Sequence, residues 1–114
     1  MNIVITGGAG FLGARLARTL LAQRQLSLAG AAPRTIARIT LVDRAHPPAD
    51  LASDPRIAAV VGDLNDLLQP GPSGTAAVPA DTHVVFHLAA AVSGECEADF
   101  DLGMRSNLDA TRAL

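Results

Sequence analysis

A glycine-rich turn close to the start of the chain limits the folds that this sequence can adopt. Residues 6–13 read Thr-Gly-Gly-Ala-Gly-Phe-Leu-Gly; they follow the apolar run Ile3-Val4-Ile5 and precede an apolar repeat at helical spacing. A strand, a glycine turn and a helix in this order are typical of a dinucleotide-binding corner, where backbone N–H groups and the positive end of the helix meet a diphosphate. No Lys-Ser or Lys-Thr pair follows the turn, which excludes the phosphate-binding loop of nucleoside triphosphatases.

Three glycines of this turn have separate expected roles. Gly7 permits the sharp turn, Gly10 leaves room for a diphosphate against bare backbone, and Gly13 lets the helix approach the sheet closely. The spacing is G-x-x-G-x-x-G, whereas many dehydrogenases have G-x-G-x-x-G. Glycine-rich turns also serve purely structural purposes, so the rest of the chain has to support a nucleotide site.

Apolar runs and their breaks predict the remaining elements. Four strands are expected at residues 2–6, 39–42, 57–61 and 82–88. A helix is expected at residues 11–25, with a buried stripe of Leu12, Leu16, Ala17, Leu20 and Leu21. We expect a connector at residues 26–35, a surface loop at residues 70–79, and a last helix that begins near residue 97 or 98 and is unfinished at Leu114.

Alternating strands and helices predict an α/β fold. Continuous apolar strands indicate a sheet that is covered on both faces, so we expect a Rossmann-type doubly wound parallel sheet. The sheet is expected to be incomplete, with about four strands, because the chain stops within a helix. Residues 1–114 are therefore predicted to be the N-terminal part of a dinucleotide-binding domain, without the catalytic and substrate-binding portion.

Acidic residues follow two of the predicted strands. Asp43 ends the second strand, where a carboxylate accepts hydrogen bonds from the adenosine ribose and repels a 2′-phosphate, so it favours NAD over NADP. Arg44 beside it weakens that preference, because it offers a cation to a phosphate. Asp43 lies 30 residues beyond Gly13, later than the roughly 20 residues that are usual; the connector at residues 26–35 explains the excess. Asp63 has two open interpretations, a contact with the adenine amino group or an N-cap for residues 64–69.

The end of the fourth strand carries small residues and a histidine. Small residues at 89–91 let a flat ring lie close to the backbone, although a tightly packed corner would also require them. We interpret His87 as a hydrogen-bonded structural residue. The spacing of His46 and His83 suggests no metal site.

The composition excludes several classes of partner. The formal net charge is −2, and no block of basic residues is present to bind a phosphate backbone. Only 3% of the residues are aromatic, so few side chains could stack on bases. We therefore do not expect the chain to bind nucleic acid. The single cysteine, Cys96, fits a reducing compartment. No apolar run approaches the ~18 residues of a membrane span, and no secretory leader is visible, so the cytoplasm is the expected location.

Five motifs in order resemble the extended short-chain dehydrogenase/reductases, the NAD-dependent epimerase/dehydratase family. They are residues 6–13, Leu41-Val42-Asp43, Gly62-Asp63-Leu64, residues 86–90 and Asn107-Leu108-Asp109-Ala110-Thr111. The resemblance implies NAD as cofactor, with Gly7, Gly10, Phe11, Leu12 and Gly13 at the diphosphate, Asp43 at the ribose, Asp63 and Leu64 at adenine, and Leu88, Ala89 and Ala90 beside nicotinamide. It also implies that Asn107 supports the catalytic lysine through water; Ala110 stands where glycine is usual.

The catalytic Tyr-x-x-x-Lys of that family is missing, since the chain contains no tyrosine. We therefore expect the 114 residues alone to be inactive. Ser93 is at best a residue of the substrate pocket or of the cofactor pocket. The first hypothesis is the cofactor portion of an enzyme that transfers a hydride from a small sugar acid to NAD, homodimeric when full length. The alternatives are a sugar-nucleotide epimerase or dehydratase that retains NAD, and a nucleotide-binding module without catalysis.

Overall fold

A parallel sheet forms the centre of the molecule. The computed structural model describes residues 1–69, 71–91 and 93–114; the side chains of residues 73–75, 93 and 94 lie outside this description. The sheet has four strands in the order β5-β4-β1-β6, and every neighbouring pair is parallel. Their bounds are β1 (Asn2–Thr6), β4 (Arg38–Asp43), β5 (Ile57–Val61) and β6 (Val84–His87). The sheet grows from β1 first on one side and then on the other, so β1 and β6 flank its topological switch point.

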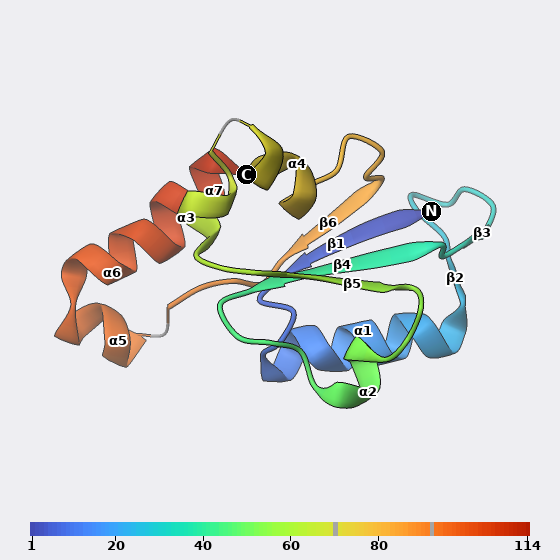
Figure 1. The fold of residues 1–114 in the computed structure, drawn as a ribbon, viewed down its shortest axis with the longest axis horizontal. Coiled ribbons are helices and arrows are strands. Elements are labelled where there is room, and N and C mark those ends of the chain that lie inside the picture. The colour runs from blue at the N-terminus through green and yellow to red at the C-terminus, as the bar shows by residue number, and fades with distance from the viewer. Residues whose placement is uncertain (70, 92) are drawn as a thin grey trace.

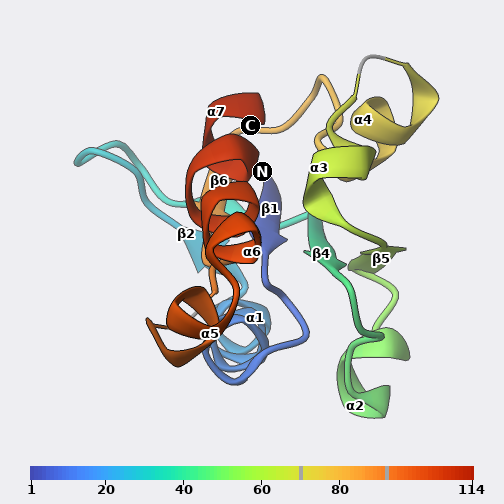
Figure 2. The same ribbon diagram turned by 90° about the vertical axis from the view of Figure 1, so that its left-hand side faces the viewer.

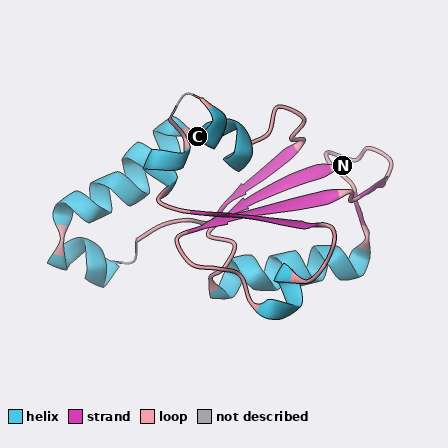
Figure 3. Ribbon diagram, viewed as in Figure 1, coloured by secondary structure: helices cyan, strands magenta, loops and turns pink. Residues whose placement is uncertain are grey.

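Helices cover both faces of this sheet, as Figures 1 and 3 show. One face carries α1 (Phe11–Gln23) and α2 (Ala49–Ala52), and the other carries α3 (Leu64–Leu67), α4 (Pro72–Ala77) and α7 (Ala110–Ala113). Successive strand residues point to opposite faces. Ile3 and Ile5 therefore join the core under α1, whereas Val4 packs with Val42 and Ala77 on the other side. This two-sided burial explains the continuous apolar strands, and the predicted fold class is confirmed.

Helix α1 is turned differently from the expected orientation. Its buried residues are Gly13, Ala14, Ala17, Leu20 and Leu21. The prediction that Leu12 belongs to the buried stripe is wrong, because Leu12 is 65% exposed. Gly13 takes the position closest to the sheet, and a residue one position earlier points about 100° away from that face.

Two segments that were expected to be irregular contain regular structure. The connector includes a small antiparallel pair, β2 (Gln25–Leu26) and β3 (Arg34–Thr35). The prediction of a loop at residues 70–79 is wrong for Pro72–Ala77, which form α4. Pro70 lies outside the described residues. Proline is well suited to the first turn of a helix, and Ala77 at the end of α4 is fully buried.

The C-terminal part of the chain is helical from residue 93, earlier than expected. It consists of α5 (Ser93–Ala98), α6 (Phe100–Met104), the π-helical segment η1 (Arg105–Asp109) and α7. Figure 2 shows α6 and α7 following one another, with α5 turned aside at the far end. The Asp99 carboxylate caps α6 by accepting a hydrogen bond from the Leu102 N–H at 3.1 Å. Among the described residues, no helix combines the length and apolar character that a bilayer crossing requires.

Candidate functional site

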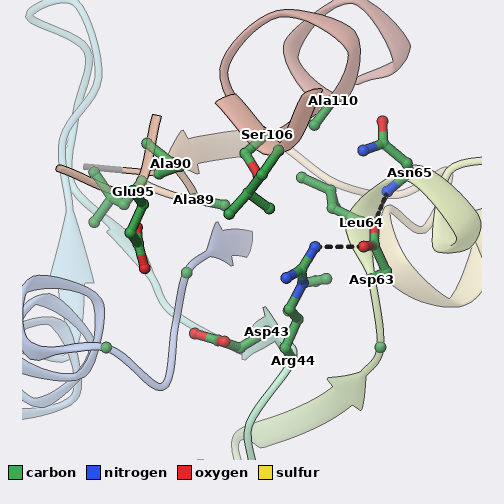
Figure 4. Close-up of a pocket in the computed structure, with 17 residues that line it drawn as sticks. Asp43, Arg44, Asp63, Leu64, Asn65, Ala89, Ala90, Glu95, Ser106 and Ala110 are labelled. Atoms are coloured by element: carbon green, nitrogen blue, oxygen red, sulfur yellow. Dashed lines mark hydrogen bonds and ion pairs between the residues drawn. The ribbon is translucent and has the colours of Figure 1, made fainter. Parts of the chain in front are cut away.

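The carboxyl edge of the sheet opens onto a cavity of about 340 Å³. Each strand contributes to its wall: Gly7 and Gly10 follow β1, Asp43 ends β4, and residues 62–65 and 88–91 follow β5 and β6. The predicted cofactor-binding residues that line it are Gly7, Gly10, Asp43, Asp63, Leu64, Leu88, Ala89 and Ala90. Figure 4 shows the helical wall opposite the strand ends, which includes Glu95, Ser106 and Ala110. The structure thus brings segments from along the whole chain to one site.

The glycine turn is tightly packed at Gly7 and Gly13 and borders free space at Gly10. The Gly7 N–H donates to the Val42 carbonyl at 2.8 Å, and Gly7 has a φ of +70°, which few L side chains adopt. A Cβ at Gly13 would lie 2.1 Å from the Gly7 carbonyl oxygen, so the first turn of α1 presses directly on this backbone. A Cβ at Gly10 would meet only that oxygen, at 3.4 Å. Gly10 therefore borders free space, which fits the bare backbone that a diphosphate requires.

Asp43 is fixed beside this turn. Its Oδ2 accepts a hydrogen bond from the Ala9 N–H at 3.0 Å, and its Oδ1 accepts one from the Ala45 N–H at 3.3 Å. The first bond ties the end of β4 to the glycine turn across 34 residues. The carboxylate is thus held at the cavity wall in a defined position.

Asp63 has the capping role that was one of its two interpretations. Its Oδ1 accepts a hydrogen bond from the Asn65 N–H at 2.9 Å at the start of α3, and its Oδ2 is 2.5 Å from Arg44 Nη2. Burial acts to raise the pKa of the Asp63 carboxyl, but the hydrogen bonds from Asn65 and Arg44 outweigh it and leave this pKa below its usual range. Asp63 is therefore ionised at neutral pH.

Thr6 and His87 join β1 to β6 at the switch point. The fully buried Thr6 hydroxyl accepts hydrogen bonds from the N–H groups of Leu88 at 3.1 Å and Ala89 at 3.2 Å. It also lies 2.6 Å from His87 Nδ1, and His87 Nε2 lies 2.9 Å from the Thr111 hydroxyl. Burial lowers the pKa of His87, so the ring is neutral at pH 7, in keeping with a structural histidine.

Thr6→Val is expected to lower the free energy of unfolding by about 1–3 kcal/mol, because the Ala89 N–H and the His87 ring lose a buried partner. Leu88 keeps its second acceptor, the Thr6 carbonyl, at 3.1 Å. Thr6→Ser keeps the hydroxyl and should be closer to wild type. Chemical denaturation of the three proteins measures the difference, and equal stability of the valine and serine variants would contradict it.

Four other predicted site residues do not line the cavity: Phe11, Leu12, Gly13 and Asn107. Phe11 is 80% exposed, and neither its side chain nor that of Leu12 lines the cavity, so any contact of these residues with a diphosphate would involve their N–H groups. Asn107 forms a pair of hydrogen bonds with the backbone of Ala91, accepting from its N–H at 2.7 Å and donating to its carbonyl at 3.1 Å. Ser93 begins α5, and its side chain lies outside the described residues.

Part of the helical wall was not identified from the sequence as part of a site. Leu102, Ser106 and Ala110 line the cavity from successive turns, and their spacing of four places them on one helix face. That spacing was the signal in the sequence that could have identified this wall. The more apolar repeat that starts at Phe100 is a stronger pattern and obscures it. Glu95 carries no comparable signal.

Comparison with known proteins assigns this architecture to a family. A family model of NAD-binding domains, described as "Male sterility protein", matches residues 5–114. The chain belongs to this NAD-binding family. The motifs resemble those of the extended short-chain dehydrogenase/reductases, and the family model and the similar proteins described next confirm this resemblance.

Curated relatives and solved structures match the chain over its full length. D-erythronate dehydrogenase from Cupriavidus necator is 54% identical, over 100% of this chain and 33% of that protein. The solved nucleoside-diphosphate-sugar epimerase from Agrobacterium tumefaciens is 40% identical with a TM-score of 0.78, over 100% of this chain and 31% of that chain. MoeE5 in complex with UDP-glucuronic acid and NAD is 26% identical with a TM-score of 0.70, over 100% and 31%. The chain therefore spans about a third of the length of the curated relatives that it matches.

Proposed function

We propose that the chain is the NAD-binding portion of an oxidoreductase that transfers a hydride from a small sugar acid, such as D-erythronate, to NAD. The observation that carries the nucleotide part is the glycine turn, which is open at Gly10 and joined to Asp43 through the Ala9 N–H at 3.0 Å. The identity of 54% with D-erythronate dehydrogenase supports the substrate class. Because the chain spans 33% of that protein, we propose that it is the N-terminal part of a longer enzyme.

The residues of this chain would bind and orient the cofactor along the cavity. Gly10 is the N-cap of α1 and has no side chain to cap the first turn. The backbone N–H groups of that turn, at residues 11–13, would therefore be available to a diphosphate. Asp43 would accept hydrogen bonds from the adenosine ribose, with Asp63 and Leu64 on the adenine side. Leu88, Ala89 and Ala90 would border the nicotinamide, and Phe11, Leu12 and Gly13 would complete the diphosphate turn.

Bound NAD would supply the acceptor for the hydride, which leaves the carbon that bears the secondary hydroxyl. The accompanying hydroxyl proton needs a general base, and this chain contains no tyrosine for that purpose. We propose that the base lies in the remainder of the enzyme. Asn107 would act indirectly, since its two hydrogen bonds fix the Ala91 backbone after β6. A cytoplasmic location and a homodimeric full-length enzyme complete the proposal and rest on sequence and family alone.

The proposal is tested on the full-length protein by calorimetric titration with NAD, followed by an assay of NADH formation with D-erythronate. We expect saturable binding of NAD and substrate-dependent NADH release. Absence of NAD binding would overturn the nucleotide site. Binding of NAD without oxidation of any four-carbon or related sugar acid would overturn the substrate class only.

A second candidate is a sugar-nucleotide epimerase or dehydratase that retains its NAD. The 40% identity to the nucleoside-diphosphate-sugar epimerase favours it. Such an enzyme would convert a sugar nucleotide without net NADH release, whereas the first proposal requires NADH to accumulate with turnover. A chain that binds NAD and converts neither substrate would be the third possibility, a nucleotide-binding module.

Asp43→Asn is expected to reduce the preference for NAD over NADP about tenfold, because the amide no longer repels a 2′-phosphate yet still accepts the Ala9 N–H. The ratio of the two dissociation constants, measured by titration, gives the effect. Asp66→Asn removes the same charge from an exposed position of α3 and should leave the ratio unchanged. An unaltered ratio in the Asp43 variant would show that this carboxylate does not face the ribose.

A further inference from the structure

Two oppositely charged side chains at the end of β4 point in different directions. Figure 4 shows the Asp43 carboxylate directed to one side and the Arg44 side chain directed away from it, toward Asp63. The Asp43 carboxylate is held by the Ala9 N–H of the glycine turn. The Arg44 guanidinium is held by Asp63 Oδ2 at 2.5 Å. Both residues line the cavity, so this end of the cavity carries an acid and a cation whose positions are set by separate partners.

Asp63 is a fixed partner for Arg44. Its other oxygen accepts the Asn65 N–H at 2.9 Å, which anchors the carboxylate to the start of α3. The Asp63 side chain is 32% exposed and the Arg44 side chain 59% exposed. The guanidinium is thus the more exposed member, and its position depends on a carboxylate that the backbone of α3 holds in place.

We propose that the Arg44–Asp63 ion pair determines the selection of NAD over NADP by holding the Arg44 guanidinium away from the ribose 2′-position. This inference rests on the proposed NAD-binding function. A guanidinium next to the ribose is the feature that accommodates a 2′-phosphate in NADP-binding folds, because it binds phosphate oxygens through two parallel N–H groups. Arg44 follows Asp43 directly and would be such a group if it were released. Asp63 is therefore a positioning residue that acts through Arg44.

Release of Arg44 and a direct contact of Asp63 with adenine have different consequences. Loss of the Asp63 charge frees the guanidinium to turn toward the nucleotide and so favours NADP. A direct contact between Asp63 and adenine would change the affinity for NAD and NADP equally, because both carry the same base. The ratio of the two affinities therefore isolates the effect on the 2′-position.

The test is a double-mutant cycle on the full-length enzyme, with dissociation constants for NAD and NADP measured by calorimetry. Asp63→Asn removes the charge and keeps the N-cap, since asparagine caps helices as well as aspartate does. We expect it to raise the affinity for NADP relative to NAD about tenfold. In the Arg44→Gln background, the same change at Asp63 should alter the ratio by less than about twofold, because the guanidinium is absent.

The control and the alternative outcomes separate this inference from the proposed function. Asp66→Asn removes one charge from the exposed side of α3 and should not alter the ratio. Asp63→Ser, which also caps a helix, repeats the measurement if the asparagine variant does not fold. An unchanged ratio, or an equal shift with and without Arg44, would overturn the role of the ion pair in nucleotide selection. The proposed NAD binding would be unaffected by that result. Failure of the wild-type enzyme to bind either nucleotide would overturn the proposed function itself.

Discussion

Gly10→Val is expected to weaken NAD binding to the full-length enzyme more than about 100-fold while the fold is retained. Gly10 has φ −76° and ψ 175°, an extended conformation that valine adopts readily. A Cβ there would meet only the Gly7 carbonyl oxygen, at 3.4 Å. The valine side chain would therefore occupy the space beside the glycine turn without disturbing the protein, and a diphosphate could no longer reach the backbone.

Calorimetric titration measures the affinity, and thermal unfolding shows that the variant is folded. Ala22→Val adds bulk at an exposed position of the same helix, away from the turn, and should bind NAD like the wild type. Gly10→Ala should give a smaller loss than Gly10→Val. Full affinity in a folded valine variant would refute the diphosphate role of the turn.

Gly13→Ala is expected to have the largest effect on stability, a loss of about 3 kcal/mol or more in the free energy of unfolding. In an ordinary helix interior the same replacement stabilises by about 1 kcal/mol, because alanine has the higher helix propensity. At Gly13, however, the new Cβ would lie 2.1 Å from the Gly7 carbonyl oxygen and 2.8 Å from Gly8 Cα. These are backbone atoms of the turn, so α1 or the turn itself would have to move.

Denaturant unfolding of the full-length protein measures this loss. Ala22→Gly on the exposed side of α1 is the reverse replacement and should cost about 1 kcal/mol, less than the loss expected for Gly13→Ala. The Gly13 variant should also lose NAD affinity, since displacement of α1 changes the turn. A Gly13→Ala protein as stable as the wild type would mean that α1 does not press on Gly7.

The sheet was predictable because its signals are local. Continuous apolar runs such as Ile3-Val4-Ile5 have few alternatives to a strand that is buried on both faces. The end of each strand then determined where Gly7, Asp43 and Asp63 would meet. Helix α4 was missed because proline, glycine and serine indicate a loop, whereas the burial of Ala77 depends on the sheet beneath it.

The details of the cavity were less predictable, because they depend on contacts between distant segments. The position of Leu12 follows from how α1 is turned against Gly7 and not from helical periodicity. The pairing of Arg44 with Asp63 joins the ends of two strands, and each residue alone offered several roles. The two hydrogen bonds of Asn107 to Ala91 depend on the path of η1 past Ala91, which has no separate signal in the sequence.

The glycine turn takes its shape from residues that are synthesised much later. The Gly7 N–H is bound by Val42, the Ala9 N–H by Asp43, and the backbone around Leu88 by the Thr6 hydroxyl. A nascent chain that has emerged from the ribosome only as far as the end of α1 therefore has the glycines but none of these supports. The ability to hold a nucleotide would thus arise only after β6 has emerged, although the motif that defines it emerges before the segments that support it.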